Sequence, residues 1–278
     1  MTTRGTSRHQ RPSTADGGPE KPDYRVEALA KGLRLLTLFT EQRPAWRMVD
    51  IVAASGMPMP TVYRVVKTLT AEGYLEHLAN GDYRPGVRVL TLGSASLRSL
   101  DLVELATPKL QEVAAATGET VNLCVLNDDR VLYLVRIRNS DLVTANIQVG
   151  STLPAVHTSI GKLLLSYLDD AELRGRIGPE SFGRGYGPNA KESLDELLAE
   201  LPGIRAQGWA TQDEELAFGL RSVAAPVRDS AGRVIAGANI AVQARDWSAQ
   251  RIARELRPLI SQACGSISGL LGYFQVDQ

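Results

Sequence analysis

The side chains best suited to chemistry in this chain share one face of a short helical stretch, residues 60–68. At about 100° per residue, one arc of that stretch is apolar, formed by Val62, Val65, Val66 and Leu69. The opposite arc has no acid and carries a guanidinium, an ammonium, a phenol and two hydroxyls, on Thr61, Tyr63, Arg64, Lys67 and Thr68. Such groups hold phosphates and bond to base edges in a DNA major groove. An ordinary amphipathic surface helix has the same pattern, so the neighbouring elements decide between the two interpretations.

Those neighbouring elements follow the order of a winged helix-turn-helix. A helix over 49–55 is expected to end at Gly56, where a left-handed backbone costs little, and Pro60 suits the first turn of the next helix. After Gly73, a strand over 74–78 and a return strand at 83–84 flank an Asn-Gly turn. A hairpin directly after a recognition-type helix is the wing of this motif. We therefore expect Asn80 and Arg84 to lie along the neighbouring DNA backbone or minor groove.

A preceding helix is predicted to complete this small domain, which we place at residues 23–86. Apolar residues recur there at spacings of three and four, as Val26, Leu29, Leu33 and Leu36, and Phe39 continues the stripe. We expect this helix to pack under the other two and to bury the core of the small domain. Residues 1–22 are rich in Arg, Ser, Thr, Gly and Pro and are predicted to form a disordered arm, whose arginines either touch DNA or remain solvated.

Composition allows two domains and favours a cytoplasmic protein. The chain has 278 residues, 44% of them hydrophobic, and a formal net charge of +0. Residues 1–84 hold 12 basic and 9 acidic residues, whereas residues 85–278 hold 19 and 22, so the positive excess lies in the part expected to meet phosphates. The two cysteines, Cys124 and Cys264, lie in separate apolar runs and predict no disulfide. We expect neither a secretory signal nor a membrane span.

The rest of the chain alternates between strand-like and helical patterns. A linker helix is expected over 87–100, followed by a second domain over 101–278 that begins with a helix over 101–117. Strands are predicted at 120–126, 130–137, 142–149, 222–227 and 234–242, and helices at 159–168, 171–177, 191–207 and 248–271. Strands first, a helical middle, then strands and a closing helix predict an α+β sensor domain around a largely antiparallel sheet.

Signatures of an enzyme are missing from the sequence. There is no GxSxG nucleophile elbow, and Gly161-Lys162 lacks the upstream glycine and the following Ser or Thr of a phosphate-binding loop. The three histidines, His9, His77 and His157, do not have metal-ligand spacing. We therefore expect no catalytic residues, no metal and no cofactor, and an enzyme acting on a small acid remains a distant alternative.

Three segments together resemble the IclR family of bacterial transcription regulators: residues 56–76, 149–168 and 208–242. The second and third are most similar to the subgroup that senses aromatic acids such as protocatechuate or 4-hydroxybenzoate in the β-ketoadipate pathway, and the run Leu-Pro-Ala-x-x-Thr-Ser-x-Gly at 153–161 carries most of that similarity. Family members often have Lys-Ser where this chain has Met59-Pro60, and the subgroup often has Cys or another small residue where it has His157.

The resemblance implies a GAF-like effector domain with a ligand pocket between the sheet and the helix after Pro154. The positions that match it are His157, Thr158, Ser159, Ile160, Gln212, Asp213, Ser222 and Asn239. Backbone N–H groups at the start of that helix and these polar side chains suit a small organic acid. Arg221 and Arg138 could add an ion pair, although Arg221 could equally pair with Glu214 or Glu215. Asn239 is the most suggestive, because a buried amide in an apolar strand needs partners.

The resemblance also implies partners. We expect double-stranded operator DNA, a small acid effector and a homodimer or homotetramer, with the linker helix as a dimer contact. The alternative is the same architecture sensing a small aliphatic or keto acid such as glyoxylate or pyruvate.

Overall fold

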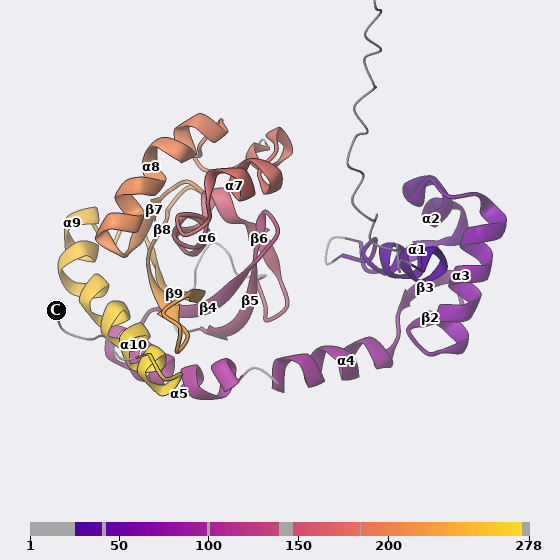
Figure 1. Cartoon of the computed structure of the whole chain (residues 1–278), viewed down its shortest axis with the longest axis horizontal. Coiled ribbons are helices and arrows are strands. Elements are labelled where there is room, and N and C mark those ends of the chain that lie inside the picture. Colours follow the sequence, from indigo (N-terminus) through magenta and orange to yellow (C-terminus); the bar gives the residue numbers. More distant parts are fainter. Residues whose placement is uncertain (1–25, 41–42, 99–100, 139–146, 184, 274–278) are drawn as a thin grey trace, which may run out of the picture. The chain divides into compact units, whose positions relative to one another are not determined.

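The chain divides after Val89 into two compact units (Figure 1). The computed structural model describes residues 26–40, 43–98, 101–138, 147–183 and 185–273. The predicted arm over 1–22 and residues 142–146 of one predicted strand lie outside the described residues. Each unit is described by itself.

The first unit is the winged helix-turn-helix that the sequence predicts. Its elements are α1 Glu27–Leu36, β1 Trp46–Arg47, α2 Met48–Ser55, α3 Met59–Ala71, β2 Leu75–His77 and β3 Asp82–Pro85. The strands form an antiparallel sheet in the order β1-β3-β2, so β2 and β3 are the predicted hairpin. Helix α2 ends at Gly56 in the left-handed conformation, with φ 64°. A glycine therefore marks the end of α2, and prolines mark the start of α3.

The core of this unit confirms that the first helix packs against the other two. Its fully buried side chains include Leu35, Ile51, Val62 and Val66, so α1 does pack against α2 and α3. Most of the apolar stripe of α1, however, does not face that core. Val26, Leu29 and Leu33 are exposed at 62%, 61% and 56%, while Leu36 and Phe39 are partly buried. Helical spacing identifies an apolar face but not what covers it, and here Leu35 anchors the helix instead.

The predicted linker is helix α4, Val87–Arg98. Three of its apolar side chains are exposed, namely Val87, Leu90 and Leu92. Large apolar side chains gathered on an exposed helix are typical of a surface that another molecule covers.

The second unit is built on a six-stranded antiparallel sheet in the order β6-β5-β4-β9-β8-β7. The strands are β4 Thr120–Asn127, β5 Arg130–Ile137, β6 Thr152–Pro154, β7 Ala210–Asp213, β8 Leu220–Arg228 and β9 Val234–Gln243. The first and last thirds of the domain supply neighbouring central strands, because β4 pairs with β9. This is the α+β fold around a largely antiparallel sheet that the sequence predicts.

Helices cover both faces of that sheet (Figure 1). Helix α5, Asp101–Thr117, and helix α10, Arg257–Leu270, pack against one face around a core that includes Val121, Val223 and Ile240. The other face is covered by α6 Ser159–Leu165, with α7 Asp170–Arg176 and α8 Leu194–Gln207 around it. Every residue of α6 is buried, so this short helix is the central element of its layer.

The predicted elements differ from the observed ones in a few places. Residues 147–149 are not in a strand, and the edge strand is the unpredicted β6. The unpredicted β7 is four residues long with a mixed polar sequence, too short for a period to show. Helix α8 starts at Leu194 rather than at 191, because the Ser193 hydroxyl caps it by accepting from the Glu196 N–H. The closing helix begins as α9 Ala249–Arg251 and includes a π-helical segment, Ile252–Leu256.

Candidate functional site

Helix α3 presents the polar face that the sequence predicts. Val62 and Val66 are fully buried against the small core, which turns Tyr63, Arg64 and Lys67 outward. Within the described part of the chain, neither the Arg64 nor the Lys67 head group pairs with a carboxylate. The ammonium of Lys67 lies 5.6 Å from the ring centre of Tyr63. The helix therefore exposes two cations and a phenol on one face.

The other residues predicted to contact DNA differ in exposure, and most of their side chains already have partners within the protein. The Thr68 hydroxyl donates to the Arg64 carbonyl within the helix, and Thr61 is half-buried. In the wing, Asn80 bonds through its side chain to Asp82, and Arg84 pairs with Glu76 across the hairpin at 2.9 Å. Both Arg84 and Glu76 are about half exposed, so this pair is readily exchanged for a phosphate.

Strand register brings a row of polar side chains together on the sheet face beneath α6. Asn122 of β4 lies directly opposite Asn239 of β9 on one side and Arg136 of β5 on the other. Two residues along, Ser222 of β8 lies opposite Gln212 of β7. Because side chains alternate between the faces of a sheet, these residues share the α6 side. Five strands, from two separate parts of the sequence, thus contribute to one polar stripe.

Hydrogen bonds join this stripe to the first turn of α6. Arg136 Nη1 donates to Asn122 Oδ1 at 3.1 Å, and Asn122 Nδ2 donates to Asn239 Oδ1 at 2.8 Å. Asn239 Nδ2 donates to Ser159 Oγ at 3.3 Å, and Ser159 Oγ lies 2.7 Å from Ser222 Oγ. The chain of contacts runs from a guanidinium to a pair of hydroxyls.

These side chains surround a cavity of about 20 Å³. Its lining is Asn122, Tyr133, Arg136, Ile147, Thr158, Gln212, Leu216, Leu220, Ser222, Asn239 and Ala241. The cavity offers amides, hydroxyls and a guanidinium beside apolar groups, the mixture that orients a small polar ligand. Its volume is room for about one water molecule.

Four of the eight predicted effector residues line this cavity: Thr158, Gln212, Ser222 and Asn239. Ser159 bonds to two of them, whereas Ile160 packs against the β9 backbone at Gly237. Asp213 is half exposed and pairs with Arg221 at 2.5 Å. The Arg221 guanidinium also donates to two carbonyls, so it has the structural role left open by the sequence. Arg138 is exposed.

The start of α6 differs from the expected row of free N–H groups. The Thr158 hydroxyl accepts from the Gly161 N–H at 2.9 Å and so caps the helix. Thr158 thus has a structural role as the helix cap and also lines the cavity.

His157 is fully buried on a different side from the cavity. Its ring lies 4.2 Å from the Tyr186 ring and 6.4 Å from the Phe182 ring, centre to centre. Neither ring nitrogen has a hydrogen-bond partner among the described residues. Burial, with the nearby ammonium groups of Lys162 and Lys191, lowers the pKa of His157 to about 4, so the imidazole is neutral at pH 7.

Sequence reasoning missed Asn122 and Arg136. Asn122 could have been found from the sequence, because it is an amide within an apolar strand, as Asn239 is. Arg136 had no such signal, because only the pairing of β4 with β5 places it beside Asn122.

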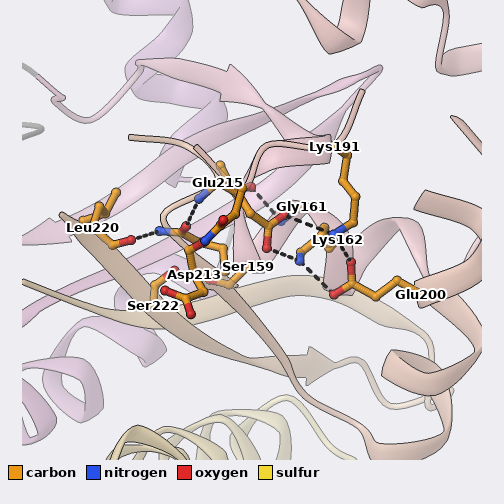
Figure 2. A network of polar contacts seen from close by, with 12 residues as sticks. Ser159, Gly161, Lys162, Lys191, Glu200, Asp213, Glu215, Leu220 and Ser222 are labelled. Carbon is orange, nitrogen blue, oxygen red and sulfur yellow. Dashed lines mark hydrogen bonds and ion pairs between the residues drawn. The ribbon is translucent and has the colours of Figure 1, made fainter. Parts of the chain in front are cut away.

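A buried cluster of ions lies next to the polar stripe (Figure 2). Lys162 of α6, only 1% exposed, donates to Glu215 at 2.6 Å and to Glu200 at 2.8 Å. Lys191 lies 3.1 Å from Glu200 and 3.9 Å from Glu215. Burial raises the pKa of Glu215. For Glu200, burial acts in the same direction, but Lys162 and Lys191 outweigh it and hold its pKa below the usual range.

The described residues hold no group of three or more His, Cys, Asp or Glu side chains placed to bind a metal. None of their helices is both long and apolar enough to cross a membrane.

Comparison with known proteins agrees with both units. Residues 28–79 match the IclR helix-turn-helix domain, and residues 94–269 match the bacterial transcriptional regulator IclR C-terminal domain. The Pca regulon regulatory protein of Pseudomonas putida is 31% identical over 87% of this chain and 82% of its own length. The HTH-type transcriptional regulator XynR of Escherichia coli K12 is 30% identical over 89% and 98%.

A solved structure shares the fold. An IclR homologue from Microbacterium hydrocarbonoxydans, crystallised with 4-hydroxybenzoate, superimposes with a TM-score of 0.71 at 25% identity, over 88% of this chain and 99% of its own.

The fold and the two matched domains define a regulator with a DNA-binding unit and an effector unit. The chain belongs to the IclR family of bacterial transcriptional regulators. It is therefore a ligand-responsive regulator of transcription and not an enzyme, as the sequence predicts.

The buried imidazole predicts a pH dependence of stability. An unfolded histidine takes up a proton near pH 6.5, but His157 in the folded chain does so only near pH 4. The unfolded state therefore binds more protons in that window, and folding stability falls as the pH falls from 6.5 to 4, by roughly 3 kcal/mol at most. His157→Phe should flatten that slope in denaturant titrations at a series of pH values. A His77→Phe variant, altered on the exposed wing, controls for loss of one histidine, and equal slopes in wild type and H157F would contradict the assignment.

Proposed function

We propose that this chain controls genes for the use of a small organic acid, most simply an aromatic one, by binding the acid in the cavity beneath α6. The observation that carries the proposal is the hydrogen-bonded stripe from Arg136 through Asn122 and Asn239 to Ser159. Buried amides and hydroxyls on a sheet are costly unless partnered, and here they gather around one cavity.

The chemistry of the lining supports an acid. The Arg136 guanidinium suits a carboxylate, and charge-assisted hydrogen bonds of that kind are the stronger ones. Ser222, Asn239 and Gln212 suit hydroxyl groups, while Tyr133 and Leu216 offer apolar area for a ring. Ser159 and Thr158 complete the set at the α6 end. His157, Ile160 and Asp213 would influence the ligand only through their neighbours.

Two observations support the aromatic class. One relative is named for the Pca regulon, and another was crystallised with 4-hydroxybenzoate. The second candidate, a small aliphatic or keto acid such as glyoxylate or pyruvate, is favoured by the small cavity volume of about 20 Å³. An aromatic acid requires the walls to separate, whereas the smaller acids require less movement.

DNA binding is proposed to follow the winged helix-turn-helix pattern. Helix α3 would enter the major groove with Arg64 and Lys67 as its main contacts, and Thr61, Tyr63 and Thr68 beside them. The wing residues Asn80 and Arg84 would lie along the adjacent backbone or minor groove. We place the protein with the chromosome, in the cytoplasm.

We propose that the chain acts as a dimer, or as a pair of dimers. One winged helix-turn-helix reads too few base pairs for useful specificity, and a two-fold dimer predicts a near-palindromic operator. The exposed stripe Val26, Leu29 and Leu33 on α1 supports a second copy as the covering partner, as do the exposed apolar side chains of α4.

Replacing the two main cations of α3 separately distinguishes base reading from phosphate holding. Arg64→Ala should relax base preference and cost about 1–3 kcal/mol on the selected site only. Lys67→Ala should weaken specific and random DNA alike and flatten the salt dependence by about one unit. Fluorescence anisotropy on a site selected from random-sequence DNA and on a scrambled duplex measures both effects. Equal losses on the two duplexes for R64A would remove Arg64 from base recognition.

A panel of acids tests the effector. Titration calorimetry with 4-hydroxybenzoate, protocatechuate, β-ketoadipate, glyoxylate and pyruvate should give binding by one class. Arg136→Gln should raise the dissociation constant of the bound acid by about 10- to 100-fold, because a charge-assisted hydrogen bond is lost. Arg138→Gln, on the exposed end beyond β5, is the matched control and should leave it unchanged. If none of the five acids bound, the proposal of a small organic acid effector would be contradicted. An unaltered dissociation constant in R136Q would contradict a contact between Arg136 and the acid.

The apolar stripe of α1 predicts an effect on assembly. Leu29→Glu should shift the chain from dimer toward monomer, because a carboxylate would have to be buried at the contact. Ala28→Glu, which adds the same charge to another exposed position of α1, should leave the assembly unchanged. Sedimentation equilibrium measures both. Unchanged assembly in L29E would exclude this face as the dimer contact.

A further inference from the structure

The ion cluster connects the two walls of the cavity. Lys162 lies in α6, three residues after Ser159, whose hydroxyl belongs to the polar stripe. Its partner Glu215 lies in residues 214–219, the connection between β7 and β8, which we call the pocket loop. Figure 2 shows Lys162 with Glu215 on one side and Glu200 of α8 on the other. One buried ammonium thus bonds to an element of the helical layer and to the pocket loop.

The pocket loop forms part of the cavity wall. Leu216 lines the cavity, and the Glu215 N–H donates at 2.9 Å to the side-chain oxygen of Gln212, which lines it as well. The Gln212 amide donates in turn to the carbonyl of Leu220 at 3.2 Å. The position of Glu215 therefore fixes both Gln212 and Leu216 at the cavity.

The polar attachments of the pocket loop outnumber its apolar ones. Phe218 is 77% exposed, and Leu216 is only partly buried in a small cluster with Leu220. By contrast every residue of α6, the facing wall, is buried. Segments with little buried apolar area open at lower free energy than the packed elements around them.

A second strip of backbone lies against the same loop. The Gly187 N–H donates to the Glu215 carbonyl at 2.9 Å, and Asn189 donates from its side chain to the Asp213 carbonyl. A side chain at Gly187 would overlap the Glu214 carbonyl, so the approach requires glycine. Lys191, at the end of this strip, completes the ion cluster. The pocket loop is therefore held both by Lys162 of α6 and by the strip that ends at Lys191.

The cavity is too small for an organic acid, so its walls must move before one can bind. At about 20 Å³ the cavity holds roughly one water molecule, and ligand pockets are an order of magnitude larger. The pocket loop has fewer packed side chains than α6 and the central strands, so it is the part of the surroundings most able to move.

We propose that Lys162 is the positioning residue that holds the pocket loop closed, and that effector exchange proceeds through separation of Lys162 from Glu215. This inference rests on the proposed function only in taking the cavity as the effector site. Removing one partner of a buried ion pair is more disruptive than replacing both, so the variants must be matched in charge.

Glu215→Gln and Glu200→Gln provide that match. Each removes one carboxylate bonded to Lys162 and keeps the side-chain shape, but only Glu215 lies in the pocket loop. Hydrogen exchange of the full-length protein without ligand is followed by mass spectrometry in peptides covering 212–220, 186–190 and 147–151, with a peptide from α3 as internal reference. In E215Q, exchange in 212–220 should accelerate by about tenfold or more, because a charged hydrogen bond is lost. In E200Q it should change by less than about threefold.

The same three proteins are then titrated with 4-hydroxybenzoate and with pyruvate in stopped-flow and calorimetric experiments. E215Q should raise the dissociation rate and the dissociation constant of whichever acid binds, and E200Q should not. Equal acceleration of loop exchange in both variants would overturn the proposal, as would opening confined to 147–151. If E215Q does not fold, Glu215→Asp keeps the charge and lengthens the contact, and it must show intermediate acceleration. Failure of both acids to bind wild type would count against the proposed ligand class, while hydrogen exchange would still decide the role of Lys162.

Discussion

A buried polar group must find a partner, and that constraint organises the effector domain. Asn122 and Asn239 lie on central strands where the opposite face of the sheet is wholly apolar. They satisfy each other, and their remaining hydrogen-bonding capacity is met by Arg136 on one side and Ser159 on the other. The strand register and the position of α6 are both fixed by these contacts. The cavity lies beside this row of partners, so under the proposed function the groups that stabilise the fold also bind the ligand.

How much could be predicted from sequence differed between the units. The helix-turn-helix was predictable because its glycines and prolines mark the helix ends locally and its wing follows a hairpin signal. The packing of α1 was predicted, but the exposure of Val26, Leu29 and Leu33 was not, since periodicity reveals an apolar face without naming its partner. In the effector domain, Asn239 could be singled out from its apolar strand. Arg136 could not, because its role arises from pairing between β4 and β5. The ion pair of Lys162 with Glu215 joins residues 53 positions apart and leaves no local pattern.

Two kinds of polar contact serve different purposes in this chain. On α3, the exposed Arg64 and Lys67 head groups form no ion pair with a carboxylate of the described residues, as the proposed phosphate contacts require. In the effector domain, Lys162 is enclosed among carboxylates and unavailable to solvent. Exposed charges such as those on α3 act over distance, and salt screens them. A buried ion pair such as Lys162 with Glu215 depends on close contact, so any movement that separates the partners weakens it. A regulator needs both, because recognition of DNA occurs at its surface and recognition of the effector in its interior.

A ligand-responsive regulator requires coupling between effector binding and DNA binding within one chain, and the most direct test of that coupling is its reciprocity. The dissociation constant of the selected operator is measured with and without saturating acid, and that of the acid with and without saturating operator. We expect both constants to change by the same factor, typically about 5- to 150-fold. If both ligands bind tightly and neither constant changes, the acid is bound without being sensed, and the two sites are not coupled.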